Sequence, residues 1–484
     1  MHEDLDLAYM DGFEMARKFN EGSLSPTEVH DAVQAVIEAR EPFLNAISDR
    51  RPEVSRADAL SSSERWQRGE PLSAYDGVPI TIKEAIARAG IPMSFGNAGV
   101  KPHLPDRSAP SVLRAERAGL VVVASTVMPD WGMLSSGLSS RFGVTRSPLN
   151  LDWTTGGSSS GAGAAAAGGY GPLHVGTDIG GSIRLPGAWL GLAALKPSHG
   201  RIALHNPYLG RAAGPMTRTV RDAAAVMKIL SGQDPVDHTS VPSDHVSWED
   251  LTWEPRGSRI GLLTDAGCGG STRPAIIDSV QKAAKMFEAA GAEIVPIEPL
   301  MDQDLLDDLD LFWRVRSWVD YRALDQESRN RVLPYVASWC TAGSDVSGAR
   351  VLECYQSTME VARRTVAATE PYDLILSPVA PVAAFSAEKP MPFAGDHATM
   401  HHIGYTAPFN MSGQPAMSVN CGFTGDGRTI GVQIAGRRFD DRGVLRAAQW
   451  YESARGSLNA PRWPQHEIVP EPWNGRAIHT RSER

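Results

Sequence analysis

The sequence predicts an α/β fold in which a large, twisted, mixed β-sheet is covered by helices on both faces. Helix-like and strand-like segments alternate along most of the 484 residues, which is typical of layered folds of this class. Several strand-like segments are continuous apolar or β-branched runs, as expected for strands buried on both faces. Hydrophobic residues make up 42% of the chain and charged residues 21%, which is the balance of a globular protein with a large core.

The first clear helix is predicted from the segment SPTEVHDAVQAVIEA, residues 25–39. Ser25 is a good N-cap, Pro26 suits the first helical position, and Glu28 completes a capping box. The helix then has one apolar face, made by Val29, Val33, Val36 and Ile37.

Strand-like and helix-like segments follow in turn. After a second helical stretch, GVPITIKE at 77–84 is strand-like, SAPSVLRAERAG at 108–119 is helix-like, and LVVVAST at 120–126 resembles a buried strand. Helices are expected over 220–230, 273–290, much of 303–368 and after Asp440, and strands over 259–263, 292–297, 372–378, 416–421 and 429–436. No repeat or linker divides the chain, so residues 1–470 are interpreted as a single domain and residues 471–484 as a loosely ordered tail.

Charge and termini exclude several classes of partner. The net charge of −9 is spread along the chain without a basic block, so the footprint of a nucleic-acid or anionic-lipid ligand is missing. The acidic N-terminus MHEDLDLAYM does not resemble a signal peptide, and no apolar run approaches the roughly 20 residues of a membrane helix. We therefore expect a cytoplasmic protein whose partner is a small molecule.

Neither the cysteines nor the histidines predict a metal site or a disulfide framework. The cysteines lie far apart and without a C-x-x-C pair, at positions 268, 340, 354 and 421. They are interpreted as buried thiols. The segment HATMHH, with His397, His401 and His402, has no H-E-x-x-H pattern and no matching acidic ligands, so it is not interpreted as a metal site.

The stretch from Gly156 to Arg184 consists mostly of glycine, alanine and hydroxyl residues, and three interpretations compete for it. A flexible linker is disfavoured because the stretch contains the ordered-looking fragment LHVGTDIGGSIRLP. A dinucleotide fingerprint at Gly161, Gly163 and Ala166 is disfavoured because no strand precedes it. The third interpretation is that TDIGGS points backbone N–H groups into one concavity beside a serine.

Ser182, at the end of TDIGGS, is placed to be a nucleophile with its own oxyanion hole, although a serine at this position can also be a plain N-cap. A nucleophilic serine needs a base. His174 and His199 are near in sequence but are interpreted as structural residues. Lys83 ends an apolar strand-like run, where burial lowers the pKa of a lysine towards neutrality; the alternative is a lysine that reaches the surface at a strand end.

The glycine-rich stretch and the segment after it, up to LKPSHGRI, closely resemble the signature region of the amidase signature family. The similarity extends to GVPITIKEAI upstream, and to GPMTRTVRDAA, TAPFNMSGQPAMSV and GVQIAGRRFDD downstream, so it covers nearly the whole chain. The resemblance implies an amidase signature fold, and a homodimer is one possible assembly because homodimers are common among similar enzymes. It also implies an enzyme that needs neither a metal nor a cofactor.

The resemblance further implies a catalytic Ser, cis-Ser, Lys triad made of Ser182, Ser158 and Lys83, in which the bond between Gly157 and Ser158 is cis. Lys83 accepts a proton from Ser158, which deprotonates Ser182 for attack on an amide carbonyl. The oxyanion is held by the backbone N–H groups of Ile179, Gly180, Gly181 and Ser182. Residues expected to orient this relay are Ser159, Thr177, Asp178 and Arg184. Two positions depart from the family pattern: Glu84 replaces an aspartate and Ser160 replaces a glycine.

The loop MPDWGMLSSGLSS before the signature is expected to line the substrate pocket, with Trp131, Met133 and Leu134 as an apolar wall and Trp189 or Phe409 as additions. Core packing is the alternative for each. The predicted activity is hydrolysis of small, hydrophobic or aromatic amides, extending to carbamates (a urethanase activity), anilides or esters. The first alternative is the glutamine-hydrolysing component of a tRNA-dependent amidotransferase, although YLGRAAGPM stands where such proteins carry an acidic element resembling SSLDQ. The second is a binding protein without activity, against which the intact triad argues.

Overall fold

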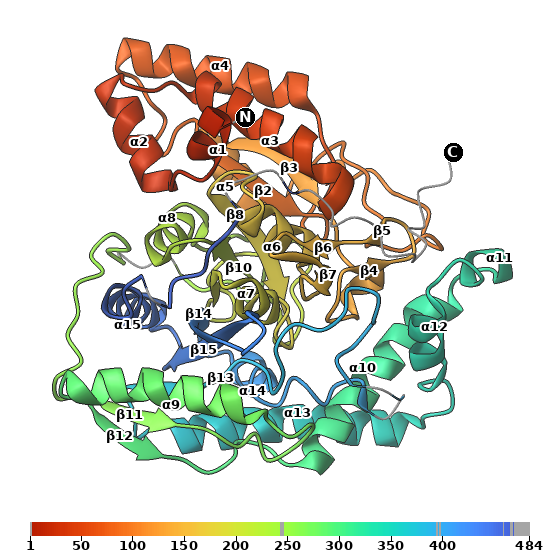
Figure 1. Cartoon of the computed structure of the whole chain (residues 1–484). Coiled ribbons are helices and arrows are strands. Elements are labelled where there is room, and N and C mark those ends of the chain that lie inside the picture. Colours follow the sequence, from red (N-terminus) through yellow and green to blue (C-terminus); the bar gives the residue numbers. More distant parts are fainter. Residues whose placement is uncertain are drawn as a thin grey trace.

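The computed structural model describes residues 2–242, 246–393, 395, 398–457, 459–464 and 468. Within these residues an 11-stranded sheet runs through the centre of the molecule, in the order β1-β3-β2-β8-β10-β9-β14-β15-β13-β11-β12 (Figure 1). Its strands are β1 (Ile47–Asp49), β2 (Pro79–Lys83), β3 (Val121–Thr126), β8 (Leu173–Asp178), β9 (Ala193–Lys196), β10 (Ala212–Thr217), β11 (Arg259–Leu262), β12 (Glu293–Pro296), β13 (Leu374–Pro378), β14 (Ala416–Phe423) and β15 (Thr429–Gly436). The predicted mixed sheet is confirmed.

The sheet combines two parallel groups with an antiparallel centre. β2 pairs in parallel with β3 and β8 at one end, and β11 pairs in parallel with β12 and β13 at the other. From β8 through β10, β9, β14 and β15 to β13, every pairing is antiparallel. Two short ribbons precede the glycine-rich stretch: β4 (Leu138–Ser139) with β5 (Gly143–Val144), and β6 (Arg146–Ser147) with β7 (Asn150–Thr154).

Helices cover both faces of the sheet, as predicted. α6 (Ser160–Ala167) and α7 (Arg184–Leu190) pack on one face, and α8 (Val220–Leu230), α9 (Pro274–Ala289) and α15 (Asp441–Ala454) on the other (Figure 1). Successive residues of β9 separate the two cores, because Ala193 and Leu195 face the larger cluster with α8, α9 and α15, whereas Ala194 faces the smaller cluster with α6 and α7.

The remaining helices lie at the two ends of the sheet. α1 (His2–Ala8), α2 (Gly12–Glu21), α3 (Pro26–Leu44), α4 (Pro52–Arg68) and α5 (Pro110–Arg117) lie near β1 and β3. At the opposite end are α10 (Gln303–Arg322), α11 (Gln326–Arg329), α12 (Pro334–Thr341), α13 (Gly348–Thr369) and α14 (Ala407–Met411). α3 begins with the predicted capping box, in which the Ser25 hydroxyl accepts from the N–H of Glu28 and the Glu28 carboxylate accepts from the N–H of Ser25.

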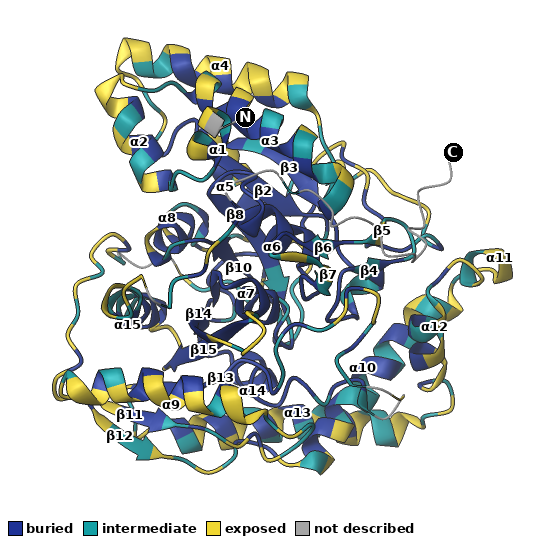
Figure 2. Ribbon diagram, in the orientation of Figure 1, coloured by how far each residue is buried: buried dark blue, intermediate teal, exposed yellow. Residues whose placement is uncertain are grey.

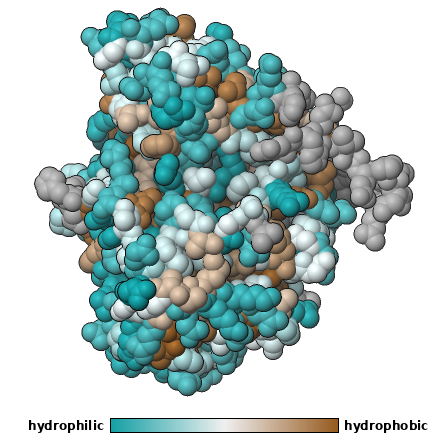
Figure 3. Space-filling view, turned by 60° about the vertical axis from the view of Figure 1, so that its left-hand side comes forward, coloured by the Kyte–Doolittle hydropathy of each residue, from teal (hydrophilic) through white to brown (hydrophobic). Residues whose placement is uncertain are grey.

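Burial follows this layering. Figure 2 shows the inner strands of the central sheet as buried, and the edge strand β12 and the outer sides of α4, α9 and α13 as partly or largely exposed. On the face shown in Figure 3, apolar residues form small patches separated by polar ones. In the described part of the chain no helix combines the length and the apolarity needed to cross a membrane. The four cysteines are free thiols, three of them buried and Cys268 partly so. The predicted tail, residues 471–484, lies outside the described residues.

Candidate active site

Lys83 is the last residue of β2 and is fully buried. Its Nζ lies 2.9 Å from Ser158 Oγ, 3.0 Å from Ser159 Oγ and 3.0 Å from Thr177 Oγ1. Burial, and to a smaller extent the nearby charge of Arg211, lower the pKa of Lys83 to about 7 against the opposing charges of Asp178 and Glu84. At neutral pH a large share of Lys83 is therefore an uncharged amine with a free lone pair.

The hydrogen bonds that the three neighbouring hydroxyl groups already make determine which of these groups can donate a proton to Lys83 Nζ. A neutral amine has two N–H bonds and one lone pair, so one of its three neighbours must donate to Nζ. The hydroxyl of Ser159 donates to the carbonyl of Thr177 at 3.1 Å, so its proton is already engaged. The lone pair of Lys83 is left for the hydroxyl of Ser158 or of Thr177.

Ser158 lies in the turn between β7 and α6, and its side chain is almost fully buried. The peptide bond between Gly157 and Ser158 is cis, as the resemblance implies. Gly157 leaves no room for a side chain, because a Cβ there would lie 2.5 Å from the carbonyl oxygen of Ser136 and 2.6 Å from that of Leu134. The glycine before Ser158 thus allows the turn to pack tightly against the loop at 134–136.

The alanine-rich part of the stretch forms α6, and every residue of this helix is buried. Gly161 on α6 lies directly against the backbone of Ala46 and Val127. Larger side chains would push the helix away from β2 and β3, on which it packs. The small residues therefore bring the start of α6, with Ser158 and Ser159, close to the end of β2 and Lys83.

Ser182 lies in the turn between β8 and α7 and is partly exposed to the cavity that Ser158 also lines. α7 begins at Arg184 with Ile183 as its N-cap, and no side chain caps it, so the plain N-cap interpretation of Ser182 is wrong. Gly181 has a φ of +125°, a conformation that favours glycine. The turn leaves the Ser182 side chain at the surface of the cavity.

One of the predicted oxyanion donors is wrong. The N–H of Gly181 donates to Asp178 Oδ1 at 2.8 Å, so it does not face a substrate. The hydrogen bonds of the described residues leave the N–H groups of Ile179, Gly180 and Ser182 unused. Three of the four predicted donors thus remain for an oxyanion.

Asp178 and Arg184 form a fully buried ion pair beneath this turn. Arg184 donates to both carboxylate oxygens of Asp178, at 2.9 and 3.0 Å, and also to Gln433 Oε1 at 2.7 Å. Asn410 Nδ2 donates to Asp178 Oδ1 at 2.8 Å. Burial alone would raise the pKa of Asp178, but the charge and hydrogen bonds of Arg184 and the bond from Asn410 outweigh it, so the pKa is lowered overall. The pair anchors the Ser182 turn to α14 and β15.

Removing one partner of this pair is expected to destabilise the protein. Arg184→Met leaves the Asp178 carboxylate buried without its counter-charge, which costs about 3–5 kcal/mol of unfolding free energy. Urea unfolding followed by circular dichroism measures this. Arg363→Met, which removes an exposed arginine on α13, serves as the control and should change stability little. Equal unfolding midpoints for both variants would contradict this account of the pair.

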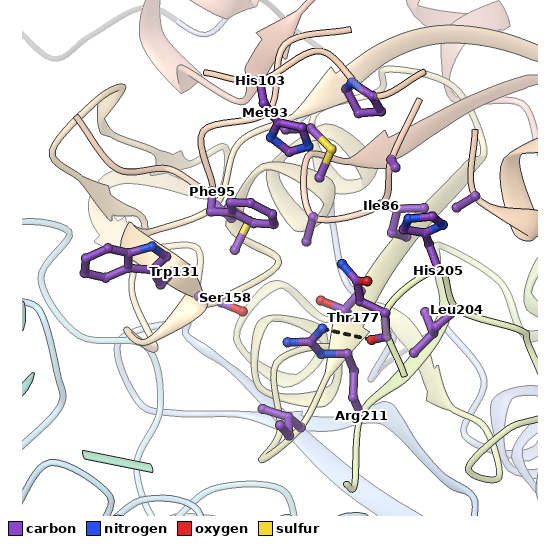
Figure 4. Close-up of a pocket in the computed structure, with 18 of the residues that line it drawn as sticks. Ile86, Met93, Phe95, His103, Trp131, Ser158, Thr177, Leu204, His205 and Arg211 are labelled. Atoms are coloured by element: carbon purple, nitrogen blue, oxygen red, sulfur yellow. Dashed lines mark hydrogen bonds between the residues drawn. The ribbon is translucent and has the colours of Figure 1, made fainter. Parts of the chain in front are cut away.

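Ser158 and Ser182 share a cavity of about 310 Å³. Its apolar lining includes Ile86, Met93, Phe95, Met128, Trp131 and Leu204. Figure 4 shows Phe95 and Trp131 on one side, Leu204, His205 and Arg211 on the other, and Ser158 between them. Trp131 and Phe95 both have positive φ, 49° and 54°, and the N–H of Trp131 donates to the carbonyl of Phe95 at 2.7 Å. The two rings are therefore presented by linked, constrained turns.

Among the predicted pocket residues, only Trp131 lines this cavity. Met133 and Leu134 are buried in a hydrophobic cluster instead, so that prediction is wrong for both. After Trp131 the loop turns inward, and these two side chains fill space near α7. The suggested additions are also core residues: Trp189 packs edge-on to Phe385 and donates to the carbonyl of Val382, and Phe409 is fully buried.

Glu84, which departs from the family pattern, holds a loop of the cavity. Its carboxylate accepts from the N–H and the hydroxyl of Ser94, at 2.6 and 2.7 Å, and from the N–H of Gly96 at 3.1 Å. Phe95 lies between these two residues. Glu84, the residue after Lys83, thus anchors the backbone on both sides of Phe95.

The two histidines considered as bases from the sequence, His174 and His199, do not join this site. His174 is fully buried and bonded to Thr81 Oγ1 at 2.8 Å and to the carbonyl of Gly171 at 3.0 Å. His199 lies outside the cavity lining. In the segment HATMHH, His402 is hydrogen-bonded to Ser135 Oγ, and His397 lies outside the described residues. The described residues contain no group of three or more His, Cys, Asp or Glu arranged to hold a metal ion.

Comparison with known proteins agrees with this architecture. Residues 28–445 match the family model Amidase. The chain is 30% identical to an acylamidase of Rhodococcus erythropolis, over 93% of this chain and 96% of the relative. It is also 30% identical to a component of the glutamyl-tRNA(Gln) amidotransferase of Chloroflexus aggregans, over 89% and 93% of the two chains.

Solved structures give the same result for the fold. A bacterial aryl acylamidase of the amidase signature family superposes with a TM-score of 0.85 at 27% identity, covering 92% of this chain and 96% of that one. A 6-aminohexanoate cyclic dimer hydrolase superposes with a TM-score of 0.84 at 25% identity, over 95% and 99%. The buried lysine, the paired serines and the match over most of the chain lead to one conclusion: the protein belongs to the amidase signature family of amide-hydrolysing enzymes.

Proposed function

We propose that the protein hydrolyses small amides through an acyl-enzyme formed on Ser182, with Ser158 and Lys83 carrying the proton. The observation that carries this proposal is the buried Lys83, whose Nζ lies 2.9 Å from Oγ of Ser158, a residue that lines the same cavity as Ser182. A lysine with a pKa of about 7 is a competent base at neutral pH.

In the proposed reaction Ser158 gives its proton to Lys83 and takes the proton of Ser182, whose oxygen attacks the amide carbonyl. The N–H groups of Ile179, Gly180 and Ser182 are the donors for the resulting oxyanion. The C–N bond then breaks as the proton returns through Ser158 to the leaving nitrogen. Water attacks the acyl group by the same relay in reverse, and this releases the acid and restores Ser182.

The lining of the cavity supports apolar or aromatic amides as substrates. Phe95 and Trp131 offer two aromatic faces near Ser158. Similarity to an acylamidase and an aryl acylamidase points the same way. A turnover screen of alkyl amides, aryl anilides, aryl carbamates, esters and glutamine tests the proposal; we expect anilides to be cleaved and glutamine not. Turnover of glutamine alone would contradict it.

The alternative is a glutamine-hydrolysing component of a tRNA-dependent amidotransferase, which the 30% identity to a protein of that kind favours. Against it, the segment YLGRAAGPM places Arg211 on the cavity at the position where those proteins carry their acidic element. Co-purification of a second protein of the amidotransferase together with glutaminase activity would reverse the order of the two proposals.

The proposed base sets the pH dependence of the reaction. Protonated Lys83 cannot accept a proton, and it loses its own as the pH rises through about 7. We therefore expect kcat/KM for a neutral anilide to rise through this range and to level off above it. A pH–rate profile measures this. A profile that is flat between about pH 5 and 9, or that falls as the pH rises through neutrality, would contradict the role of Lys83.

A further inference from the structure

Two arginines from distant parts of the chain line the same cavity as Ser182. Arg211 directly precedes β10, whose first residue, Ala212, pairs with Asp178 at the end of β8. Arg316 lies on α10, and Trp313 of this helix packs over Gly180 in the Ser182 turn. The sheet register and the placement of α10 thus bring both arginines to the lining of the cavity that Ser182 also lines.

Neither guanidinium is neutralised within the described chain. The hydrogen bond recorded for the Arg211 side chain is donated to the carbonyl of Asn206, at 3.2 Å, the dashed line in Figure 4. Among the described residues Arg316 makes no hydrogen bond or ion pair. Both cations lie against the ring of Tyr208, with guanidinium carbons 5.8 and 5.1 Å from its centroid. The ring holds both arginines in place without offsetting their charge.

Among the described residues, the carboxylates near Arg211 and Arg316 form no ion pair with either arginine. Asp320, one turn further along α10, is close enough for the charge of Arg316 to act on it, but the two form no ion pair among the described residues. Asp106 is exposed on the cavity lining beside Arg107. Asp178 is fully engaged by Arg184 and Asn410. Two like charges that repel each other at a partly desolvated site are a costly arrangement without an anion between them.

Arg211 alone has a use that needs no ligand, because its charge helps to lower the pKa of Lys83. Arg316 has no such role, since it is not among the groups that act on Lys83. The pairing of the two arginines, rather than either one alone, therefore points to a ligand. Their planar N–H donors fit a carboxylate better than any neutral group.

We propose that Arg211 and Arg316 form an anion subsite and that the preferred substrates are amides bearing a carboxylate, with their apolar part along Phe95 and Trp131. This inference rests on the proposed amide hydrolysis at Ser182 and names its substrate class. The carboxylate belongs to either the acyl or the amine side of the scissile bond. In both cases the two guanidinium groups would bind it by the same charge-assisted hydrogen bonds.

Two matched pairs of substrates test the subsite. On the acyl side, succinyl 4-nitroanilide is compared with 4-methylpentanoyl 4-nitroanilide, in which an isopropyl group replaces the carboxylate. On the amine side, 4-acetamidobenzoate is compared with 4-isopropylacetanilide. We expect the acidic member of at least one pair to have a kcat/KM higher by about tenfold to a hundredfold, the range for charge-assisted hydrogen bonds.

Arg316→Gln should abolish this preference, and Arg316→Lys, which keeps the charge but not the planar fork, should keep part of it. Arg322→Gln is the matched control, because it removes the same charge from an exposed position of the same helix and should leave the preference intact. Calorimetry of the acidic anilides with a Ser182→Ala variant gives a readout that needs no turnover: Arg316→Gln in that background should weaken their binding about tenfold or more.

Equal kcat/KM within both pairs, or an equal loss for acidic and neutral members in Arg316→Gln, would overturn the anion subsite. Turnover of the neutral anilides that depends on Ser182 would still leave the proposed hydrolysis standing. Conversely, tight binding of the acidic anilides that requires Arg316, without any turnover by the wild-type enzyme, would support the subsite while the proposed hydrolysis fails.

Discussion

Replacing Ser182 with alanine is expected to lower kcat/KM by at least about ten-thousandfold, the scale seen when a covalent nucleophile is removed. Ser182 lies in the turn after β8 and lines the cavity together with Ile179 and Ser158. Without its oxygen no acyl-enzyme forms, and Ser158 has no nucleophile to deprotonate. Steady-state kinetics on an anilide that the wild-type enzyme cleaves measures the loss.

Ser160→Ala is the matched control for Ser182→Ala. Ser160 belongs to the same glycine-rich stretch, but its hydroxyl makes only a 3.5 Å contact with the carbonyl of Val127 and does not line the cavity. This variant should keep activity within about threefold, since the contact is weak. If Ser182→Ala keeps more than about a tenth of the wild-type kcat/KM, the nucleophile lies elsewhere and the proposed reaction is wrong.

Lys83→Met is expected to lower kcat by about a hundredfold to ten-thousandfold, the range for loss of a general base. Methionine fills a similar volume in the buried site but has no lone pair of useful basicity. Lys83→Arg should be equally inactive, because a guanidinium stays protonated at any pH the enzyme tolerates. Substantial activity in Lys83→Arg would show that the positive charge of this residue matters rather than its lone pair, and would contradict the proposed role.

The folded fraction of both lysine variants must be measured before their activities are compared, since Lys83 is buried at the end of β2 and bonds to three hydroxyl groups there. Urea unfolding identifies any variant that is lost for structural reasons. Lys196 shows why geometry is needed besides burial: it is also fully buried with a pKa of about 7, yet its Nζ donates to the carbonyl of Pro197 and it does not line the cavity. A lowered pKa alone does not identify a base.

Much of the fold was predictable because its elements have strong local signals. The capping box at Ser25 marks the start of α3, and the apolar run ending at Lys83 forms β2. β10 was harder to predict as a strand, since its residues, AAGPMT, include a glycine, a proline and a single β-branched side chain, Thr217. It forms a strand because it is fully buried between β8 and β9, a tertiary constraint that no local pattern contains.

The candidate site was predictable in part. The signature motif predicted Lys83, Ser158 and Ser182 as the triad, and the structure places Lys83 Nζ within hydrogen-bond distance of Ser158 Oγ. The direction of the Gly181 N–H depends on a backbone torsion that the sequence does not encode locally. Met133 and Leu134 were misassigned because an apolar loop can face either a cavity or the core, and the turn at Trp131 directs them inward.

Arg211 and Arg316 were missed for a different reason. They are far apart in sequence and belong to no motif, and it is tertiary packing, including that of Trp313 on Gly180, that brings α10 to the Ser182 turn. The replacement of an acidic element by YLGRAAGPM was the one available signal for Arg211. For Arg316 no pattern in the sequence distinguishes it from its neighbours Arg314 and Arg322 on the same helix.

The central claim is that Ser182 is an activated nucleophile, and covalent labelling tests it most directly. A serine-reactive fluorophosphonate, followed by peptide mass spectrometry, should place one phosphonyl group on Ser182 in the wild-type enzyme. The label should be absent from Ser182→Ala and strongly reduced in Lys83→Met, where the serine is no longer activated. Labelling of a different side chain, or turnover that persists in an enzyme left unlabelled at Ser182, would contradict the account.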